Sequence, residues 1–268
     1  MIDKKIVVNK GYLKNLLSFS QKELFTHILN KVSKNNNYEL IIQSFGNGIV
    51  IIPKGVGSYP LICTHLDTIN DSKKIKLQNS DIEINGDIIR LSKSSSAKCL
   101  GGDDRCGVYS ALQLIDLNAP YAFAFFCDEE IGCIGSSILA KDIDENSNIT
   151  AFIGLDRRGL DNVAIYGYDN RDLIQLFENE GYIEVDGSIT DVSILSEQNS
   201  RNLACVNLSV GYYNEHTKKE FINVNGIKRA IQTLIKLSFN LSKDAYISKP
   251  HKFFYEEYYD KYEIMMKW

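Results

Sequence analysis

The feature that most constrains the fold is a set of short segments that are apolar at nearly every position. They lack the alternation of apolar and polar residues that is typical of a strand with one exposed face. They are PLIC within 59–68, AFAFFC within 121–130 and AFIGL within 149–156. Segments with apolar residues at helical spacing alternate with them, at 105–117, 136–143, 170–182 and 223–243. Strands that are apolar throughout are typical of a parallel sheet covered by helices on both faces. We therefore predict an α/β protein with a three-layer αβα arrangement and a mostly parallel central sheet.

The remaining segments complete this expectation. Residues 20–34 have helical spacing with Ser20 as the predicted N-cap, and residues 189–200 are predicted as a further helix. Two β-rich runs, 38–45 and 48–55, are joined by a glycine turn. In residues 81–92 the apolar residues alternate around Asn85-Gly86, the strongest short hairpin signal. Further strands are expected at 162–168 and 203–213.

Composition narrows the class of protein. The chain has 268 residues, a net charge of −4 and 44% apolar residues, which suits one domain with a large core. A mildly acidic chain without a basic stripe argues against nucleic acid as a partner. No segment has the roughly 20 apolar residues of a membrane span, and residues 1–15 have no secretory apolar core. The six cysteines form no C-x-x-C pair and are expected as buried free thiols, so we expect a cytoplasmic protein.

Charged side chains follow the predicted strands at the point where each strand ends. They are His65 and Asp67, Asp103 and Asp104, Asp128 to Glu130, Asp156, and His216. In parallel sheets, ligands bind at the carboxyl ends of the strands. Gathering so many charges in one place is too costly unless they bind a cation. The sequence therefore predicts a metal site at this edge of the sheet.

Each of these elements also has a plainer explanation when it is taken alone. Asp103 or Asp104 could be the N-cap of the helix that follows, because aspartate suits the positive end of a helix. A pair such as Glu129-Glu130 is usually solvated, and a lone histidine is usually a satisfied core or surface residue. It is the occurrence of all of them in order, each at a strand end, that favours the metal site.

Five motifs carry a resemblance to a known group of enzymes. They are THLDT at 64–68, GGDDRCG at 101–107, CDEEIG at 127–132, GLDRRG at 154–159 and GYYNEHTKKEF at 211–221. With these motifs the chain resembles the di-zinc aminopeptidase and carboxypeptidase superfamily. That superfamily includes peptidase T, the glutamyl aminopeptidases and the acetylornithine deacetylase-like amidohydrolases. The resemblance implies a zinc exopeptidase-like fold.

The resemblance also implies a role for each motif residue. Two zinc ions, with cobalt or manganese as substitutes, would be held by His65, Asp103, Glu130, Asp156 and His216. Asp103 would bridge the two ions, and its bond to Asp104 is often cis in such families. Asp67 would orient His65. Glu129 would take a proton from the metal-bridging water and deliver it to the leaving amine.

The domain organisation differs from many members of that group. The intervals from His65 to Asp103 and from Asp156 to His216 leave no room for the additional domain that relatives carry. We therefore expect a single catalytic domain over 1–268, without an inserted lid or dimerisation domain. The aromatic tail, 249–268, is expected either to pack along the domain or to form a subunit contact or a wall of the site, with His251 as a weaker candidate for an oxyanion contact.

The predicted function is that of a zinc-dependent exopeptidase, an aminopeptidase or dipeptidase acting on short peptides. In the resembling families, aspartate at the position of Asp156 is commoner in aminopeptidases and glutamate in deacylases. Two alternatives stay open: an amidohydrolase that deacylates N-acyl amino acids, and a non-catalytic relative that binds metal or peptide. Arg157 and Arg158 could meet a substrate carboxylate or could be surface charges. A homo-oligomer is possible for such a chain.

Overall fold

The computed structural model describes residues 6–43, 46–143 and 147–250. Its helices are α1 Lys10–Ser18, α2 Gln21–Val32, α3 Ile69–Ser72, α4 Gly102–Asp116, α5 Ile134–Asp142, α6 Arg171–Glu178, α7 Asp191–Gln198 and α8 Val224–Leu241, with a 3-10 turn, η2, at Asn79–Asp81. Its strands are β1 Tyr38–Ile42, β2 Gly48–Pro53, β3 Tyr59–His65, β4 Ile82–Asn85, β5 Ile88–Leu91, β6 Ala122–Phe126, β7 Ile149–Arg157, β8 Asn162–Ile165, β9 Tyr168–Asp169, β10 Ile183–Asp186, β11 Cys205–Ser209, β12 Tyr212–Tyr213, β13 Phe221–Asn223 and β14 Lys249–Pro250.

The main sheet has eight strands in the order β1-β2-β6-β3-β7-β11-β8-β10. Its centre, β6-β3-β7-β11, is parallel throughout, as the solidly apolar segments predicted. Antiparallel pairings join β2 to β6 and β11 to β8, so the sheet is mixed towards its two sides. The predicted hairpin of β1 and β2 is present at one edge.

Both faces of this sheet are buried, which explains the lack of alternation in its sequence. Within β6, Phe123 and Phe125 belong to the larger apolar cluster on one face, and Ala124 and Phe126 belong to the smaller cluster on the other. Successive side chains of a strand point to opposite faces, so a strand with helices on both sides needs apolar residues at every position. Each of the seven positions of β3 is accordingly buried.

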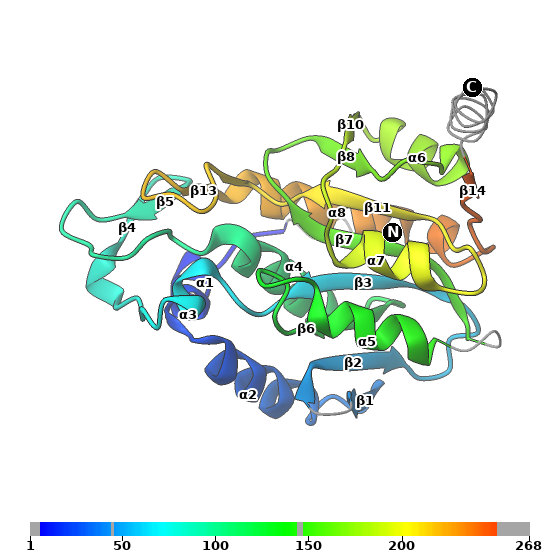
Figure 1. The fold of residues 1–268 in the computed structure, drawn as a ribbon, viewed down its shortest axis with the longest axis horizontal. Helices are drawn as coiled ribbons and strands as arrows, with labels where there is room; N and C mark the ends of the chain where they lie inside the picture. The colour runs from blue at the N-terminus through cyan, green and yellow to red at the C-terminus, as the bar shows by residue number, and fades with distance from the viewer. Residues whose placement is uncertain (1–5, 44–45, 144–146, 251–268) are drawn as a thin grey trace, which may run out of the picture.

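Helices cover the sheet in two layers (Figure 1). In Figure 1, α5 and α7 lie in front of the sheet and pack on each other, and α7 contacts β3, β7 and β11. Behind the sheet lie α4 and α8, which pack on each other and on β7. The three-layer αβα prediction is therefore confirmed. The predicted cap of α2 is also present, because Ser20 and Glu23 form a reciprocal capping box.

Some elements differ from the predictions. The predicted strand 203–213 divides into β11 and β12, which belong to different sheets. The division occurs at Gly211, whose φ is +94° and which packs against Asn223, so the chain turns there. The predicted Asn85-Gly86 hairpin forms as β4 and β5, but it joins β12 and β13 in a four-stranded antiparallel sheet. Helix α1 and strand β10 were not predicted.

Two predictions from composition can be compared with the described residues, and the prediction for the aromatic tail cannot. All six cysteines are free and buried, as expected. Within the described ranges, no helix combines the length and apolarity that crossing a membrane requires. The prediction for the aromatic tail concerns mainly 251–268, including His251, and these residues lie outside the part of the chain that the structure describes.

Candidate metal centre and active site

Three neighbouring elements bring the predicted ligands together. His65 is the last residue of β3, and Asp156 is the penultimate residue of the neighbouring parallel strand β7. Asp103 lies in the first turn of α4, which packs against both strands. Parallel strands expose their carboxyl ends along one edge, so residues far apart in sequence meet there.

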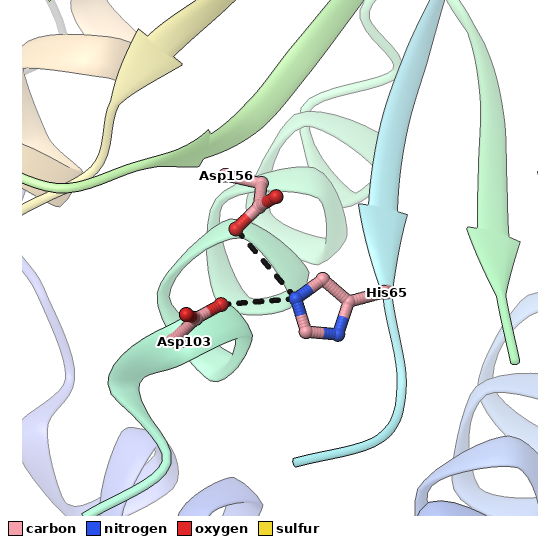
Figure 2. Close-up of side chains that lie close together, drawn as sticks. All are labelled: His65, Asp103 and Asp156. Carbon is pink, nitrogen blue, oxygen red and sulfur yellow. Dashed lines mark hydrogen bonds and ion pairs between the residues drawn. The ribbon is translucent and has the colours of Figure 1, made fainter. Parts of the chain in front are cut away.

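The first ligand group consists of His65, Asp103 and Asp156. Nε2 of His65 lies 3.0 Å from Oδ1 of Asp103 and 3.6 Å from Oδ1 of Asp156. Figure 2 shows both carboxylates directed at this one ring nitrogen. A single ring nitrogen can donate or accept only one hydrogen bond, so two carboxylates converging on it from different sides form a set of donor atoms suited to a shared cation.

The second group shares Asp103 with the first. The other oxygen of Asp103, Oδ2, lies 3.2 Å from Nε2 of His216, and Oε1 of Glu130 lies 3.0 Å from the same nitrogen. In each group, one donor atom per residue lies within 4.8 Å of every other. The two oxygens of Asp103 therefore face two different histidines, as the bridging position predicted for this residue requires.

In the turn formed by Gly101 to Asp104, the carboxylates of Asp103 and Asp104 have different contacts. The peptide bond between Asp103 and Asp104 is cis, as the resemblance implied. Asp103 faces the histidines, while Oδ1 of Asp104 accepts a hydrogen bond from the backbone N–H of Gly107 at 2.9 Å and so caps the regular part of α4. The N-cap explanation of this motif therefore holds for Asp104, whereas Asp103 is left to face the two histidines. A side chain at Gly102 would meet Ile222, Tyr212 and Glu220 at 2.9 to 3.0 Å, which explains the glycine there.

Asp67 links the first group to the turn that follows β6. Its Oδ1 lies 3.3 Å from Nδ1 of His65, close enough for an ion pair but not aligned as a hydrogen bond. The same carboxylate accepts the backbone N–H groups of Glu129 and Glu130, each at 3.0 Å. Asp67 therefore contacts the histidine that it is predicted to orient, and it also holds the turn that carries Glu129 and Glu130, which was not predicted.

Glu129 and Glu130 leave this turn in different directions. Glu130 reaches His216, whereas the carboxyl of Glu129 contacts the thiol of Cys133 at 3.7 Å. Glu129 belongs to neither ligand group of the described residues, yet it lines the same pocket as the ligands. Burial raises the pKa of Glu129 to about 8, so its environment favours a bound proton. Glu129 is therefore a pocket-lining carboxyl beside both groups that belongs to neither of them.

The surroundings of these residues shift their pKa values in two ways. Burial raises the pKa of two aspartates, and hydrogen bonds lower the pKa of Asp103 and raise that of His216. Burial raises the pKa of Asp156 to about 6, and that of Asp104 well above its usual range. The pKa of Asp103 is lowered, because hydrogen bonds from His216 and His65 outweigh the opposing effect of burial. Hydrogen bonding to Asp103 and Glu130 raises the pKa of His216 to about 11. Buried carboxylates need positive charge nearby, and without a bound cation the protonated histidines supply it.

Several supporting residues were not predicted. Asp156 accepts hydrogen bonds from Oγ1 of Thr190 at 3.0 Å and from the hydroxyl of Tyr212 at 3.1 Å. The amide of Asn207 holds the backbone of Asp156 through two hydrogen bonds of 2.8 Å. Asn207 lies in the middle of β11 and Thr190 is the N-cap of α7, so neither a strand-end position nor a charge pattern distinguishes them in the sequence.

Glu220 and Arg105 also belong to the predicted motifs without having been assigned a role. Glu220 is buried and accepts the backbone N–H groups of Gly101 at 2.8 Å and Asp103 at 3.2 Å, and burial raises its pKa to about 7. Arg105 is buried under the THLDT segment and donates to the carbonyls of Leu16, Leu66 and Phe19. A charged residue inside a motif of metal ligands could have been recognised as a support for the turn.

A pocket of about 260 Å³ opens beside the two groups. Asp103, Glu129, Glu130, Asp156 and His216 line it together with Arg157 and Arg158. The two predicted substrate-binding arginines thus lie at the same pocket as the ligands. Arg158 forms an ion pair with Glu215, at 2.6 Å.

Comparison with known proteins finds solved structures with a similar fold. No family model matches the chain, and no curated protein matches it. Among solved structures, aminopeptidase PepT from Bacillus cereus matches with a TM-score of 0.64 and 13% identity, over 85% of this chain and 98% of that chain. A tripeptidase from Staphylococcus aureus matches with a TM-score of 0.66 and 12% identity, over 87% and 97%.

A third solved structure extends the comparison. The TET1 peptidase of Pyrococcus horikoshii, which is described as assembling into a tetrahedron or a large octahedral shell, matches with a TM-score of 0.58 and 15% identity, over 87% and 99%. At such identities the likeness concerns the fold. The resemblance predicted from the motifs is confirmed at that level, and the chain has the fold of the PepT and TET aminopeptidases.

Proposed function

We propose that the protein is a two-metal aminopeptidase that removes N-terminal residues from short peptides. The observation that carries this proposal is the shared carboxylate, because the two oxygens of Asp103 face His65 and His216 separately. A single ion would need only one of these groups. The aminopeptidase fold and a pocket beside both groups support the same function.

The donor set fits zinc. In the first group, His65, Asp103 and Asp156 would hold one ion, and in the second, Asp103, Glu130 and His216 would hold the other. Imidazole nitrogens and carboxylate oxygens suit zinc, and cobalt or manganese could replace it. When bound, two such ions lower the pKa of water and polarise a carbonyl group.

The residues of the chain supply positioning and proton transfer. Asp67 fixes His65 and the turn that carries Glu129, so the base keeps a constant place relative to the ligands. Glu129 would accept the proton of the attacking water at its carboxylate and then donate it to the leaving amine. A carboxylate that lines the pocket outside both ligand groups can carry that proton between the two steps.

A peptide-library digest tests this function. Purified protein is loaded with zinc, cobalt or manganese, and the products are read by mass spectrometry, with Glu129→Gln as the inactive control. Stepwise loss of N-terminal residues from free-amine peptides is expected, with no cleavage of the N-acetylated set. Cleavage confined to N-acyl substrates would instead make the protein a deacylase. Metal binding without cleavage of either set would make it a non-catalytic relative.

The proposal extends to domain organisation and assembly. Between His65 and Asp103 the chain forms α3, η2 and the β4–β5 hairpin, and this short interval supports a single catalytic domain without an inserted lid. A homo-oligomer is proposed because the TET1 peptidase, with a similar fold, assembles into large shells. Light scattering of the full chain at several concentrations tests it, and a mass of one chain throughout would contradict it.

A further inference from the structure

The pocket beside the ligand groups has a wall that the proposed reaction does not use. Besides the ligands and Glu129, this wall includes Arg157, Arg158, Tyr166, Ser188 and Ile189. Tyr166 lies close enough to Arg157 for the guanidinium to act on the phenol electrostatically. An aminopeptidase pocket needs groups that recognise the substrate, and this wall is where the described residues offer them.

The two arginines of this wall differ in what they contact. Arg158 is exposed and its guanidinium is paired with Glu215 at 2.6 Å. Arg157 is half-buried, and its Nε is fully buried without a hydrogen-bond partner. Within the ranges that the structure describes, no carboxylate lies within ion-pairing distance of Arg157. The buried Nε cannot itself be reached from the pocket, but Arg157 also lines that pocket, so its side chain is suited to an acceptor from outside the chain.

Electrostatics indicates what kind of acceptor that is. With two divalent ions bound as proposed, the ligand carboxylates and Glu129 are offset by the ions, and Arg158 is already offset by Glu215. Arg157 is then a pocket-lining cation with no carboxylate of the described residues at ion-pairing distance. A guanidinium binds a carboxylate through paired N–H groups, with more geometric specificity than a lysine.

We propose that Arg157 is a specificity-determining residue that binds a carboxylate of the substrate. This inference rests on the proposed function and specifies its substrate class: peptides with a carboxylate close to the scissile bond. Arg157 directly follows the ligand Asp156, so the carboxylate must lie within a residue or two of that bond. It is therefore either the side chain of an acidic first residue or the free C-terminus of a peptide of two or three residues.

Three peptides separate these two sources. Met-Ala-Ala-amide is the neutral reference, Glu-Ala-Ala-amide carries only the side-chain carboxylate, and Met-Ala-Ala carries only the terminal one. For at least one of the acidic peptides, Arg157→Met is expected to lower kcat/KM by about 10- to 100-fold, the usual effect of losing a charged hydrogen bond. The reference peptide should change by less than about threefold, and Arg157→Lys should restore part of the loss.

Arg158→Met is the matched control, because it removes an equal charge from the same wall. Arg158→Met should leave the ratio of kcat/KM for acidic over neutral peptides unchanged. Arg157→Met should bring this ratio close to one. An equal loss for all three peptides with Arg157→Met would mean a structural role and would overturn the proposal. So would a wild type without preference for either acidic peptide.

A binding measurement keeps this inference separate from the proposed function. Calorimetry on the zinc-loaded Glu129→Gln variant, with and without Arg157→Met, gives affinities for the same peptides without turnover. Tighter binding of an acidic peptide that depends on Arg157 supports the inference even if the wild type cleaves nothing, in which case only the proposed function fails. Equal affinities for acidic and neutral peptides, or no binding of either, would overturn the inference.

Discussion

The two ligand groups differ sharply in how the fold holds them. His65 is 1% exposed at the end of a strand that is buried at every position. The side chain of His216 is 45% exposed, in the loop between β12 and β13, and its φ is +63°. Asp156 has hydrogen bonds from Thr190 and Tyr212 on its two oxygens, as a ligand fixed by the core would.

This difference divides the candidate centre into two halves. The rigid half is the first ligand group, and the adaptable half is the second. The strands β3 and β7 fix His65 and Asp156 before any ion arrives, so little ordering of these two residues is needed on binding. The second group depends on His216, a loop residue whose side chain is half exposed and contacts only Asp103 and Glu130 among the described acidic residues. We therefore expect the first group to hold its ion more tightly and the second to exchange its ion more readily.

Asp103→Ala gives the largest expected effect, because this residue belongs to both halves. Bound zinc should fall at both positions, by far more than the roughly 10- to 100-fold loss of affinity expected for Asp67→Ala, because Asp67 supports His65 and the Glu129–Glu130 turn without being a proposed ligand. Elemental analysis of the two purified variants measures the difference. Equal metal contents would remove the case for a shared carboxylate.

Glu129→Gln tests whether the proposed base, Glu129, belongs to neither ligand group. The variant should keep two ions per chain and lose at least about a hundredfold in turnover, the usual contribution of a general base. Elemental analysis and peptide kinetics on the same preparation give both quantities. If zinc were lost together with activity, the roles given to Glu129 and Glu130 would have to be exchanged.

The contrast between the halves is tested by comparing His65→Ala with His216→Ala. Titration of zinc into metal-free wild type should show two classes of site, separated by about tenfold or more in affinity. His216→Ala should lose the weaker class and keep the tighter one, and His65→Ala should do the reverse. Two sites of equal affinity, or loss of the tighter site in His216→Ala, would contradict the assignment.

Glu220→Gln gives the smallest expected effect and concerns the turn that both halves share. The amide can accept only one of the two backbone N–H groups, so the metal-free protein should lose about 1–3 kcal/mol of unfolding free energy at pH 5. The folded pKa of Glu220 is raised to about 7 by burial, above its unfolded value. Its favourable contribution is therefore complete below the unfolded pKa and is lost as pH rises through 7.

The deficit of Glu220→Gln should therefore shrink between pH 5 and pH 8. Urea unfolding of wild type and variant across this range measures it. Thr217→Val, in the same loop, is the matched control, and the difference between Thr217→Val and wild type should not change with pH. A Glu220→Gln deficit that grows with pH would show that Glu220 is ionised in the folded protein throughout.

The sequence predicted the part of this site that strands position. His65 and Asp156 follow apolar runs directly, so their place at the edge of a parallel sheet could be inferred from those runs. Glu130 and His216 were assigned through motif resemblance, because loop conformation is not encoded by periodicity. The hydrogen bonds of Thr190, Asn207 and Tyr212 could not be predicted, because neutral polar residues carry no pattern and their partners are distant in sequence.

The contact between Glu220 and the Asp103 turn has a consequence for the order in which the protein matures. The carboxylate that holds the backbone of Asp103 lies 117 residues further along the chain. During synthesis, β3 and α4 can form well before Glu220 leaves the ribosome, but the shared ligand is then held by only part of its support. The same applies to His216, which emerges almost as late. If two ions bind as proposed, the first group is complete once Asp156 has been synthesised, and the second only after His216 follows, 60 residues later.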